Sequence, residues 1–264
     1  MLQISFHSDL GEKNYIHSIA KSLLESQIDQ AKVTDVFNRS KHNTDLEEYA
    51  YNMLASIHYF PPQSVHVFFS QYFSIDSTIV ITKIKNQYVI LPNNGIVSII
   101  DYIDYTSKKY IVQVEKPEQL NWVQFTIMVM AEICNSIQKN TALDEIGTFT
   151  NNYKLSFPLS NGLQIGDNFI YYRIIYIDSY SNAVTNLHID DFREHVGIKP
   201  FKTSLLGKYN IEKISKNYQD VDESSYVGGI FNDLGFFEIF LSIGELCSQL
   251  KITKKSAIKL KLEY

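Results

Sequence analysis

Residues 46–69 read LEEYAYNMLASIHYFPPQSVHVFF and predict a helix, a break and a strand in direct succession. Apolar side chains recur at helical spacing over residues 46–60, and Pro61 and Pro62 end that pattern because proline lacks the N–H that a helix interior needs. Val65–Phe69 is then apolar almost without interruption, as in a strand that is covered on both faces. This succession is typical of an α/β domain.

The same alternation of strand and helix signals continues on both sides of this stretch. Helical spacing predicts helices at 15–26 and 120–137, and β-like runs predict strands at 2–7 and 32–37 and a hairpin at 78–83 and 87–91. Alternating strands and helices favour a mainly parallel sheet. We therefore predict an α/β N-terminal domain over residues 1–150.

The second half of the chain has a different pattern. After a polar stretch at 151–154, interpreted as a linker, short strand signals appear at 164–168, 168–177, 183–189, 208–214 and 236–241, with one weak helix signal at 242–249. The tail 251–264 alternates Ile and Leu with Lys, and we interpret it as an amphipathic edge strand rather than an anion site. An all-β, barrel-like C-terminal domain is predicted over residues 155–264.

Length and composition exclude several classes of protein. The 264 residues suit two domains, 45% of them are hydrophobic, and the net charge of −5 argues against a dedicated nucleic-acid binder. Cys134 and Cys247 alone cannot supply a disulfide framework or a multi-cysteine zinc site. The N-terminus does not resemble a signal peptide, and no apolar run is long enough to span a bilayer. We expect a cytoplasmic protein without a membrane partner.

Familiar catalytic motifs are missing from the sequence. It has no glycine-rich phosphate loop, no GxGxxG after the first strand, no GxSxG and no HExxH. The histidines are scattered singly, so we predict no metal site and no cofactor.

Five segments, taken in order, resemble one family. They are 8–11 (SDLG), 59–67 (YFPPQSVHV), 92–95 (PNNG), 177–187 (IDSYSNAVTNL) and 232–239 (NDLGFFEI). The chain resembles the S-adenosyl-L-methionine (SAM) hydroxide adenosyltransferases, or SAM hydrolases, which are related to the nucleophilic fluorinase and chlorinase. The resemblance implies an α/β domain followed by a β-barrel domain. It also implies a homotrimer with ligand sites between subunits, and conversion of SAM and water to adenosine and L-methionine.

The resemblance also implies which side chains touch the ligand. Asp9 matches the residue that grips the ribose, although an Asp in this place also suits a turn before a helix. Asp178, Tyr180 and Asn182 match positions that contact the methionine amino group and adenine, and their alternative role is a β-turn. The last motif supplies the remaining ligand-binding candidates, Asn232, Asp233 and Glu238.

The sequence departs from the family at the positions that handle water. Gln71 stands at or near a family Asp, Ser77 or Thr78 stands near an Arg, and Asn121 stands near a His. Gln and Asn orient a water molecule but cannot accept its proton near neutral pH. We therefore expect weak or lost SAM hydrolysis. The alternatives are a non-catalytic homotrimer that binds SAM or adenosine, and a structural trimer whose pocket is vestigial.

Overall fold

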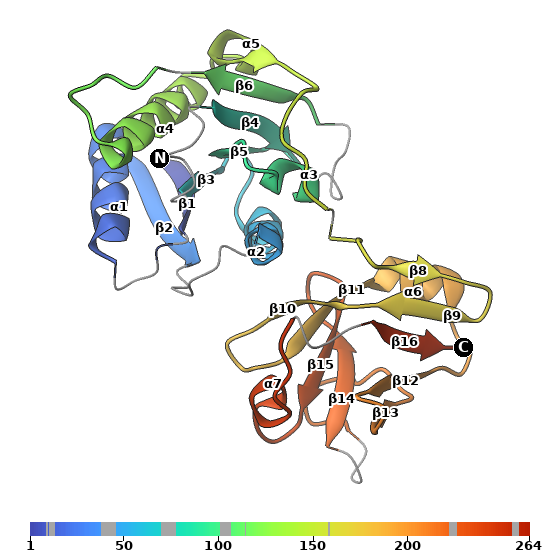
Figure 1. Ribbon diagram of the computed structural model, residues 1–264. Helices are drawn as coiled ribbons and strands as arrows, with labels where there is room; N and C mark the ends of the chain where they lie inside the picture. The colour runs from blue at the N-terminus through green and yellow to red at the C-terminus, as the bar shows by residue number, and fades with distance from the viewer. Residues whose placement is uncertain are drawn as a thin grey trace. The chain divides into compact units, whose positions relative to one another are not determined.

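The computed structural model divides the chain into two compact units, Met1–Pro158 and Leu159–Tyr264 (Figure 1). It describes residues 1–8, 10, 14–37, 46–69, 78–100, 107–113, 115–157, 159–221, 226–254 and 259–264, with the side chains of 37, 99 and 100 excepted. Each unit is described by itself. Among the described residues, no helix combines the length and the apolar character needed to cross a bilayer.

A mixed sheet forms the centre of the N-terminal unit. Its described strands lie in the order β2-β1-β3-β5-β4-β6-β7. The first four of these are parallel, namely β2 (Ala31–Phe37), β1 (Leu2–Ser8), β3 (Val65–Phe69) and β5 (Gln87–Pro92). The other three, β4 (Thr78–Ile84), β6 (Lys109–Gln113) and β7 (Thr148–Phe149), add antiparallel strands at one edge. The predicted α/β class with a mainly parallel sheet is confirmed.

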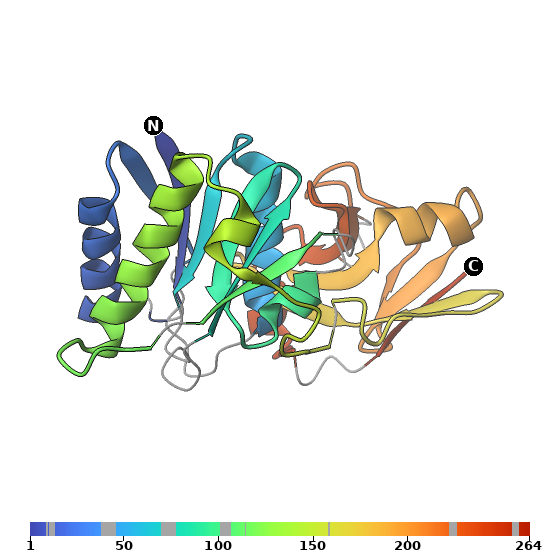
Figure 2. The ribbon, with the colours of Figure 1, turned by 90° about the horizontal axis from the view of Figure 1, so that it is seen from above.

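Helices cover both faces of this sheet (Figure 2). α1 (Tyr15–Gln27) and α4 (Trp122–Gln138) pack on the face that carries Ile4 and Phe6, and all of these elements contribute to one buried apolar cluster. α2 (Leu46–Tyr59) lies against the opposite face. Two short helices, α3 (Ile96–Ile100) and α5 (Leu143–Ile146), occur in connections.

A buried polar network lies on the α2 face of the sheet. Ser5 Oγ lies 2.9 Å from His7 Nε2 and 2.6 Å from His66 Nδ1, and His66 Nε2 lies 2.5 Å from Gln87 Oε1. The Gln87 amide then donates to the carbonyls of Ile57 and Phe60 at the end of α2, at 2.9 Å each. The network therefore satisfies backbone groups at the C-terminal end of this helix, which would otherwise be left without partners.

The C-terminal unit consists of antiparallel strands with two short helices, within the described residues. One sheet has the order β10 (Ile174–Ile177), β11 (Ala183–His188), β15 (Phe236–Leu241) and β14 (Val227–Phe231). The other has the order β13 (Tyr209–Ile211), β12 (Lys202–Leu205), β16 (Leu260–Glu263), β9 (Phe169–Tyr172) and β8 (Gln164–Ile165). Buried side chains from both sheets, including Tyr172, Phe237 and Leu262, share one core. The helices are α6 (Ile189–His195) and α7 (Leu246–Gln249).

The structure corrects the interpretation of the tail. β16 is not an edge strand, because it pairs with β12 on one side and with β9 on the other. Its alternation of Leu and Lys is nevertheless that of a strand with one face toward the core, since Leu260 and Leu262 are buried. The pattern predicted the strand but not its neighbours, which depend on the topology of the whole unit.

Two strands and one helix of this unit were not predicted. β14 carries Gly228 and Gly229, which weaken the strand signal, and the structure shows why glycine is needed there. A Cβ at either position would collide with the ring of Phe240 or Phe237 on the neighbouring strand. β12 and the seven-residue α6 are too short to give a clear periodic signal.

Candidate functional site

The segment between β10 and β11 is a tight turn organised by Asp178. Asp178 Oδ1 accepts hydrogen bonds from the backbone N–H groups of Tyr180 and Asn182, at 2.9 and 2.8 Å. The turn also has backbone hydrogen bonds from Ser181 N–H to Asp178 O and from Asp178 N–H to Asn182 O, at 3.1 Å each. Asp178 thus has the turn-forming role typical of Asp, and its Oδ2 atom faces the Asn182 side chain.

Contacts with α7 hold this turn in place. Ser181 has a positive φ of 67° and is buried. Its Oγ lies 2.8 Å from Ser248 Oγ and accepts from the Ser248 N–H at 3.0 Å. The Cys247 N–H donates to the Ser181 carbonyl at 2.9 Å. The turn is therefore fixed by the helix that follows β15 rather than by its own hydrogen bonds alone.

Glu238 joins the two sequence motifs of this unit. It lies on β15, where the register pairs it with Val184 of β11. Glu238 Oε1 accepts from Asn182 Nδ2 at 3.1 Å and from the Tyr218 hydroxyl at 3.0 Å, and Oε2 accepts from Asn232 Nδ2 at 3.2 Å. Asn182 Nδ2 also donates to Asp178 Oδ2 at 3.1 Å. We call Asp178, Asn182, Tyr218, Asn232 and Glu238 the Glu238 cluster.

The turn before β15 places Asn232 in this cluster. Asn232 Oδ1 accepts from the N–H groups of Leu234 and Phe236, both at 3.1 Å, which leaves its amide nitrogen to face Glu238. Gly235 closes the turn with a φ of 83°, and a Cβ there would lie 2.5 Å from His188 Nε2. Asp233 is exposed on the same turn.

The electrostatics of the Glu238 cluster follow from burial. Only 4% of Glu238 is exposed, and burial raises the pKa of its carboxyl group. Burial, followed by the charge of Glu238, also raises the pKa of Tyr218, so that this hydroxyl keeps its proton and donates. The cluster is rich in carboxylate and carbonyl oxygens. It suits a ligand that offers N–H groups or positive charge.

The other predicted site residues are not members of the Glu238 cluster. Tyr180 is 76% exposed, which leaves its ring available for stacking against a flat ligand. Thr78 begins β4, where it pairs with Gln113 of β6. Asn121 caps α4, since its Oδ1 accepts from the Gln124 N–H at 2.9 Å, and Gln124 completes a capping box.

Three predicted site residues lie outside the described residues. They are Asp9, at the predicted ribose position, and Gln71 and Ser77, at the predicted water-handling positions. The register pairs Ser8, at the end of β1, with Phe69, at the end of β3. Both strands therefore end at the same edge of the sheet, the carboxyl edge at which α/β proteins bind ligands.

Tyr218 is the member of the Glu238 cluster that the sequence analysis missed. It lies in the polar stretch between β13 and β14, where a single Tyr shows no periodicity and no motif. Only the fold brings its hydroxyl to Glu238.

Comparison with solved structures gives full-length matches at low sequence identity. A crystal structure of an uncharacterized conserved protein from Thermotoga maritima matches with a TM-score of 0.80 at 16% identity, covering 99% of this chain and 100% of that one. A conserved hypothetical protein from Thermus thermophilus matches with a TM-score of 0.69 at 15% identity, covering 100% of this chain and 99% of that one. These matches support the fold. Comparison with curated proteins gives no match.

Family models cover most of the chain. The N-terminal domain of SAM hydroxide adenosyltransferase matches residues 4–147, and the C-terminal domain of the same family matches residues 172–259. The second match includes the Glu238 cluster and both motifs that build it. The chain therefore belongs to the SAM hydroxide adenosyltransferase family.

Proposed function

We propose that this protein binds SAM or adenosine at a site to which the Glu238 cluster contributes, and that it hydrolyses SAM slowly or not at all. The observation that carries the proposal is the convergence of Asp178, Asn182, Asn232 and Glu238 from two separate family motifs into one hydrogen-bonded cluster. Family membership supports SAM as the ligand.

The chemistry of SAM suits such a cluster. The ligand carries a sulfonium and an ammonium, and adenine offers an amino group. The carboxylates of Asp178 and Glu238 favour these positive and N–H-bearing groups, and the exposed ring of Tyr180 is placed to stack on a base. Asp9 is proposed to accept hydrogen bonds from the ribose hydroxyls. No general acid is needed, because the bond between C5′ and the sulfonium sulfur breaks to release methionine as a neutral thioether.

Slow turnover follows from the residues at the water-handling positions. A water that attacks C5′ must lose a proton, and neither Gln71 nor Asn121 accepts one near neutral pH. In addition, the Asn121 side chain is engaged in capping α4. These residues can then contribute only by positioning the water and the sulfonium. Positioning alone permits slow residual hydrolysis of SAM.

Binding is tested by calorimetry with SAM, adenosine and methionine. We expect adenosine and SAM to bind and to raise the melting temperature, since a ligand that binds only the folded state stabilises it. Asn182→Ala should weaken adenosine binding by up to about tenfold, the upper end of the net range for a hydrogen bond between neutral groups. The matched control is Asn210→Ala, at an exposed position of β13 outside the cluster. If neither SAM nor adenosine binds, the proposal fails.

Turnover is measured by chromatography of methionine and adenosine after incubation with SAM. A single well-placed acid or base contributes about 10²–10⁴-fold in rate, so we expect slow hydrolysis or none. The variant Gln71→Asp/Thr78→Arg/Asn121→His should hydrolyse SAM faster. Turnover of several SAM molecules per minute by the native protein would overturn the proposal of weak catalysis and leave the binding proposal in place.

A further inference from the structure

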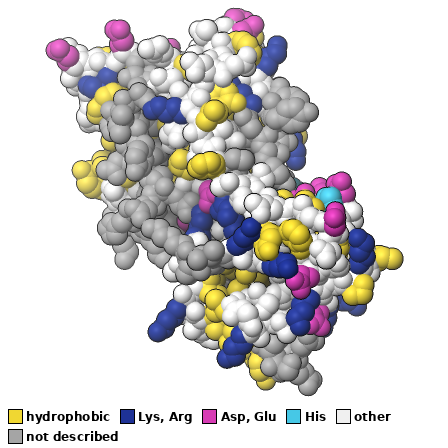
Figure 3. Space-filling view, turned by 45° about the vertical axis from the view of Figure 1, so that its right-hand side comes forward, with side chains coloured by type: hydrophobic (Ala, Val, Ile, Leu, Met, Phe, Trp, Pro, Cys, Tyr) yellow, Lys and Arg dark blue, Asp and Glu magenta, His cyan; other side chains and the backbone are white. Residues whose placement is uncertain are grey.

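Glu238 is the one acidic side chain that is buried among the described residues. On the surface of the C-terminal unit, in the lower part of Figure 3, acidic side chains lie beside lysine and arginine side chains. Water solvates a carboxylate at the surface, whereas a buried carboxylate depends on the hydrogen bonds that the protein supplies. The neighbours of Glu238 in its cluster therefore decide its charge.

Three side chains donate hydrogen bonds to the Glu238 carboxylate, and they come from three different segments. Asn182 Nδ2 and the Tyr218 hydroxyl reach Oε1 at 3.1 and 3.0 Å, and Asn232 Nδ2 reaches Oε2 at 3.2 Å. A proton on the carboxyl group would compete with these donors for the oxygen lone pairs. Hydrogen bonds to a charged acceptor are also about twice as strong as those to a neutral one. Protonation of Glu238 therefore loosens the cluster.

Asn182 carries this change to the ligand site. Its amide nitrogen has two hydrogens, of which one points to Asp178 Oδ2 and the other to Glu238 Oε1, both at 3.1 Å. The carbonyl oxygen of the same amide is the group that remains to accept from a ligand N–H. When the hydrogen bond to Glu238 weakens, Asp178 alone orients this amide. Glu238 is thus a positioning residue that acts on the ligand through Asn182.

Burial makes the neutral form of Glu238 accessible in weakly acidic solution. Burial is the largest influence on this carboxyl group and raises its pKa above the ordinary value of 4.5, and the charge of Asp178 acts in the same direction. The hydrogen bonds from the three donors oppose this shift without cancelling it. Glu238 therefore takes up a proton at a higher pH than an exposed glutamate does.

Two other titratable side chains near the cluster keep their protons between pH 5 and pH 8. Burial, followed by the charge of Glu238, raises the pKa of Tyr218. Burial raises the pKa of Cys247, on α7, to about 12, and the charge of Asp178 contributes to this shift. Neither group changes its charge in the range where Glu238 does.

His188 is the neighbour that must be separated from Glu238 by experiment. Its Nε2 atom lies 3.3 Å from the carbonyl oxygen of Leu234, on the turn that also carries Asp233. Histidine is the residue type whose charge ordinarily changes between pH 5 and pH 8. A pH effect on the cluster can therefore be assigned to Glu238 only when His188 has been replaced.

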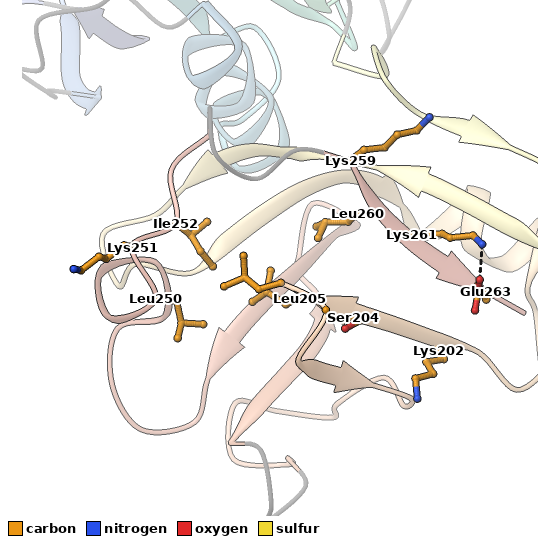
Figure 4. A pocket seen from close by; sticks show the side chains of 12 residues that line it. Lys202, Ser204, Leu205, Leu250, Lys251, Ile252, Lys259, Leu260, Lys261 and Glu263 are labelled. Carbon is orange, nitrogen blue, oxygen red and sulfur yellow. Dashed lines mark hydrogen bonds and ion pairs between the residues drawn. The ribbon is translucent and has the colours of Figure 1, made fainter.

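A cavity of about 460 Å³ in the same unit shares no residue with the Glu238 cluster (Figure 4). The side chains of Lys251 and Lys259 point away from it, and Lys261 pairs with Glu263. No charged group of this cavity is therefore aimed at a ligand, within the described residues. We expect pH-dependent binding in this unit at the Glu238 cluster and not at the cavity.

We propose that Glu238 makes adenosine binding depend on pH, because its ionised form holds the cluster in the arrangement that binds the nucleoside and its protonated form does not. This inference rests on the proposed function, since it concerns the regulation of the same site. A ligand that binds only the ionised form loses affinity as the pH falls through the pKa of Glu238. Binding to a protonated cluster must then release the proton to solvent.

The test is calorimetry of adenosine binding to the full chain between pH 8 and pH 5, with circular dichroism at each pH to confirm that the protein stays folded. We expect adenosine to bind about three- to tenfold more weakly at pH 5 than at pH 8, because affinity falls by up to about tenfold for each pH unit below the pKa. Titrations at pH 5 in buffers with different heats of ionisation should show that binding releases protons.

Three variants assign the effect. Glu238→Gln is neutral at every pH, so it should bind adenosine weakly and with equal affinity at pH 8 and pH 5. Tyr218→Phe removes one donor from the ionised carboxylate, so the fall in affinity should begin at a higher pH. His188→Gln is the matched control and should keep the native pH dependence.

The outcomes separate this inference from the function on which it rests. Absence of adenosine binding at every pH would overturn the proposed function and this inference with it. Adenosine binding of equal strength at pH 8 and pH 5 would overturn this inference alone, as would loss of the pH dependence in His188→Gln. If Glu238→Gln does not fold, Tyr218→Phe decides, and a pH dependence that stays unchanged or moves to lower pH contradicts the proposal.

Discussion

At the scale of single residues, Asn182 has the most constrained role in the Glu238 cluster. Its amide nitrogen donates to Asp178 Oδ2 and to Glu238 Oε1, both at 3.1 Å, and only 7% of the residue is exposed. It thus separates two carboxylates that would otherwise face each other without a donor between them. A side chain with no N–H at this position would leave that repulsion unscreened.

We predict that Asn182→Asp destabilises the protein at pH 8 by roughly 2–4 kcal/mol, because two donated hydrogen bonds become contacts between like charges. Burial raises the pKa of Glu238, so protonation on acidification should relieve the repulsion and shrink this difference. Urea unfolding of native and variant protein at pH 8 and pH 5 measures it. Asn210→Asp, at an exposed position of β13, is the control, and an equal loss at both pH values would contradict the prediction.

The buried histidines of the N-terminal unit predict a second pH effect. His7 and His66 are fully buried in the network with Ser5 and Gln87. Burial lowers the pKa of His66 from 6.5 to about 4 and that of His7 well below 6.5. At pH values between the lowered pKa of each histidine and 6.5, the unfolded chain binds protons that the folded chain does not. The free energy of unfolding therefore falls as the pH drops from 6.5 toward 4.

For His66 alone the loss should reach about 3 kcal/mol near pH 4, since each pKa unit is worth about 1.4 kcal/mol. We expect His66→Gln to reduce the slope of stability against pH, measured by urea unfolding between pH 7.5 and pH 4.5. His58→Gln, at an exposed position of α2, should keep the native slope. A His66→Gln protein with the native slope would show that this histidine is not responsible.

At the scale of elements, α4 begins at a capping box that also bears on function. The family resemblance suggests that Asn121 stands near a His of the family, yet in the structure its side chain accepts from the Gln124 N–H. We predict that Asn121→Ala costs about 1 kcal/mol of stability through the lost cap, whereas Asn121→Asp costs little. Adenosine affinity should stay unchanged in both variants. Unfolding curves and calorimetry check this, and a loss of affinity in Asn121→Ala would assign Asn121 to the ligand site.

Elements with long periodic patterns were predictable from the sequence, and those fixed by distant neighbours were not. α1, α2 and α4 follow from helical spacing, and β3 follows from its apolar run. β14 has no such signal. Its two glycines are required because the rings of Phe237 and Phe240 on the neighbouring strand leave no room for a Cβ. The tail was predicted as a strand, but its place between β12 and β9 depends on pairing that no local pattern encodes.

The same limit applies to the candidate site. Asp178, Asn182, Asn232 and Glu238 lie in recognisable motifs, so the sequence pointed to them, and the structure brings their side chains together. Tyr218 lies in a polar stretch without a motif, and only the tertiary fold places its hydroxyl 3.0 Å from Glu238. Tyr218 and Glu238 are 20 residues apart in the sequence, so the packing of the unit, rather than residue type, makes them hydrogen-bond partners.

At the scale of the whole molecule, both units expose large apolar side chains. Leu155 and Phe157 are 78% and 72% exposed in the first unit, and Tyr180 and Ile243 are 76% and 79% exposed in the second. Aromatic side chains such as Phe157 and Tyr180 are enriched in protein–protein interfaces, so these residues are material for one. They support the proposal, which follows from the family resemblance, that the protein is a homotrimer.

We predict a mass near three times 30.5 kDa by light scattering at micromolar concentration. If each ligand site is shared between subunits, adenosine binds the trimer and not the monomer. Saturating adenosine should then restore the trimer in samples diluted until it dissociates, because a ligand stabilises the state that it binds. Methionine alone is the control. A monomer at micromolar concentration that binds adenosine as tightly as a concentrated sample would exclude the shared site, since its pocket would be complete within one chain.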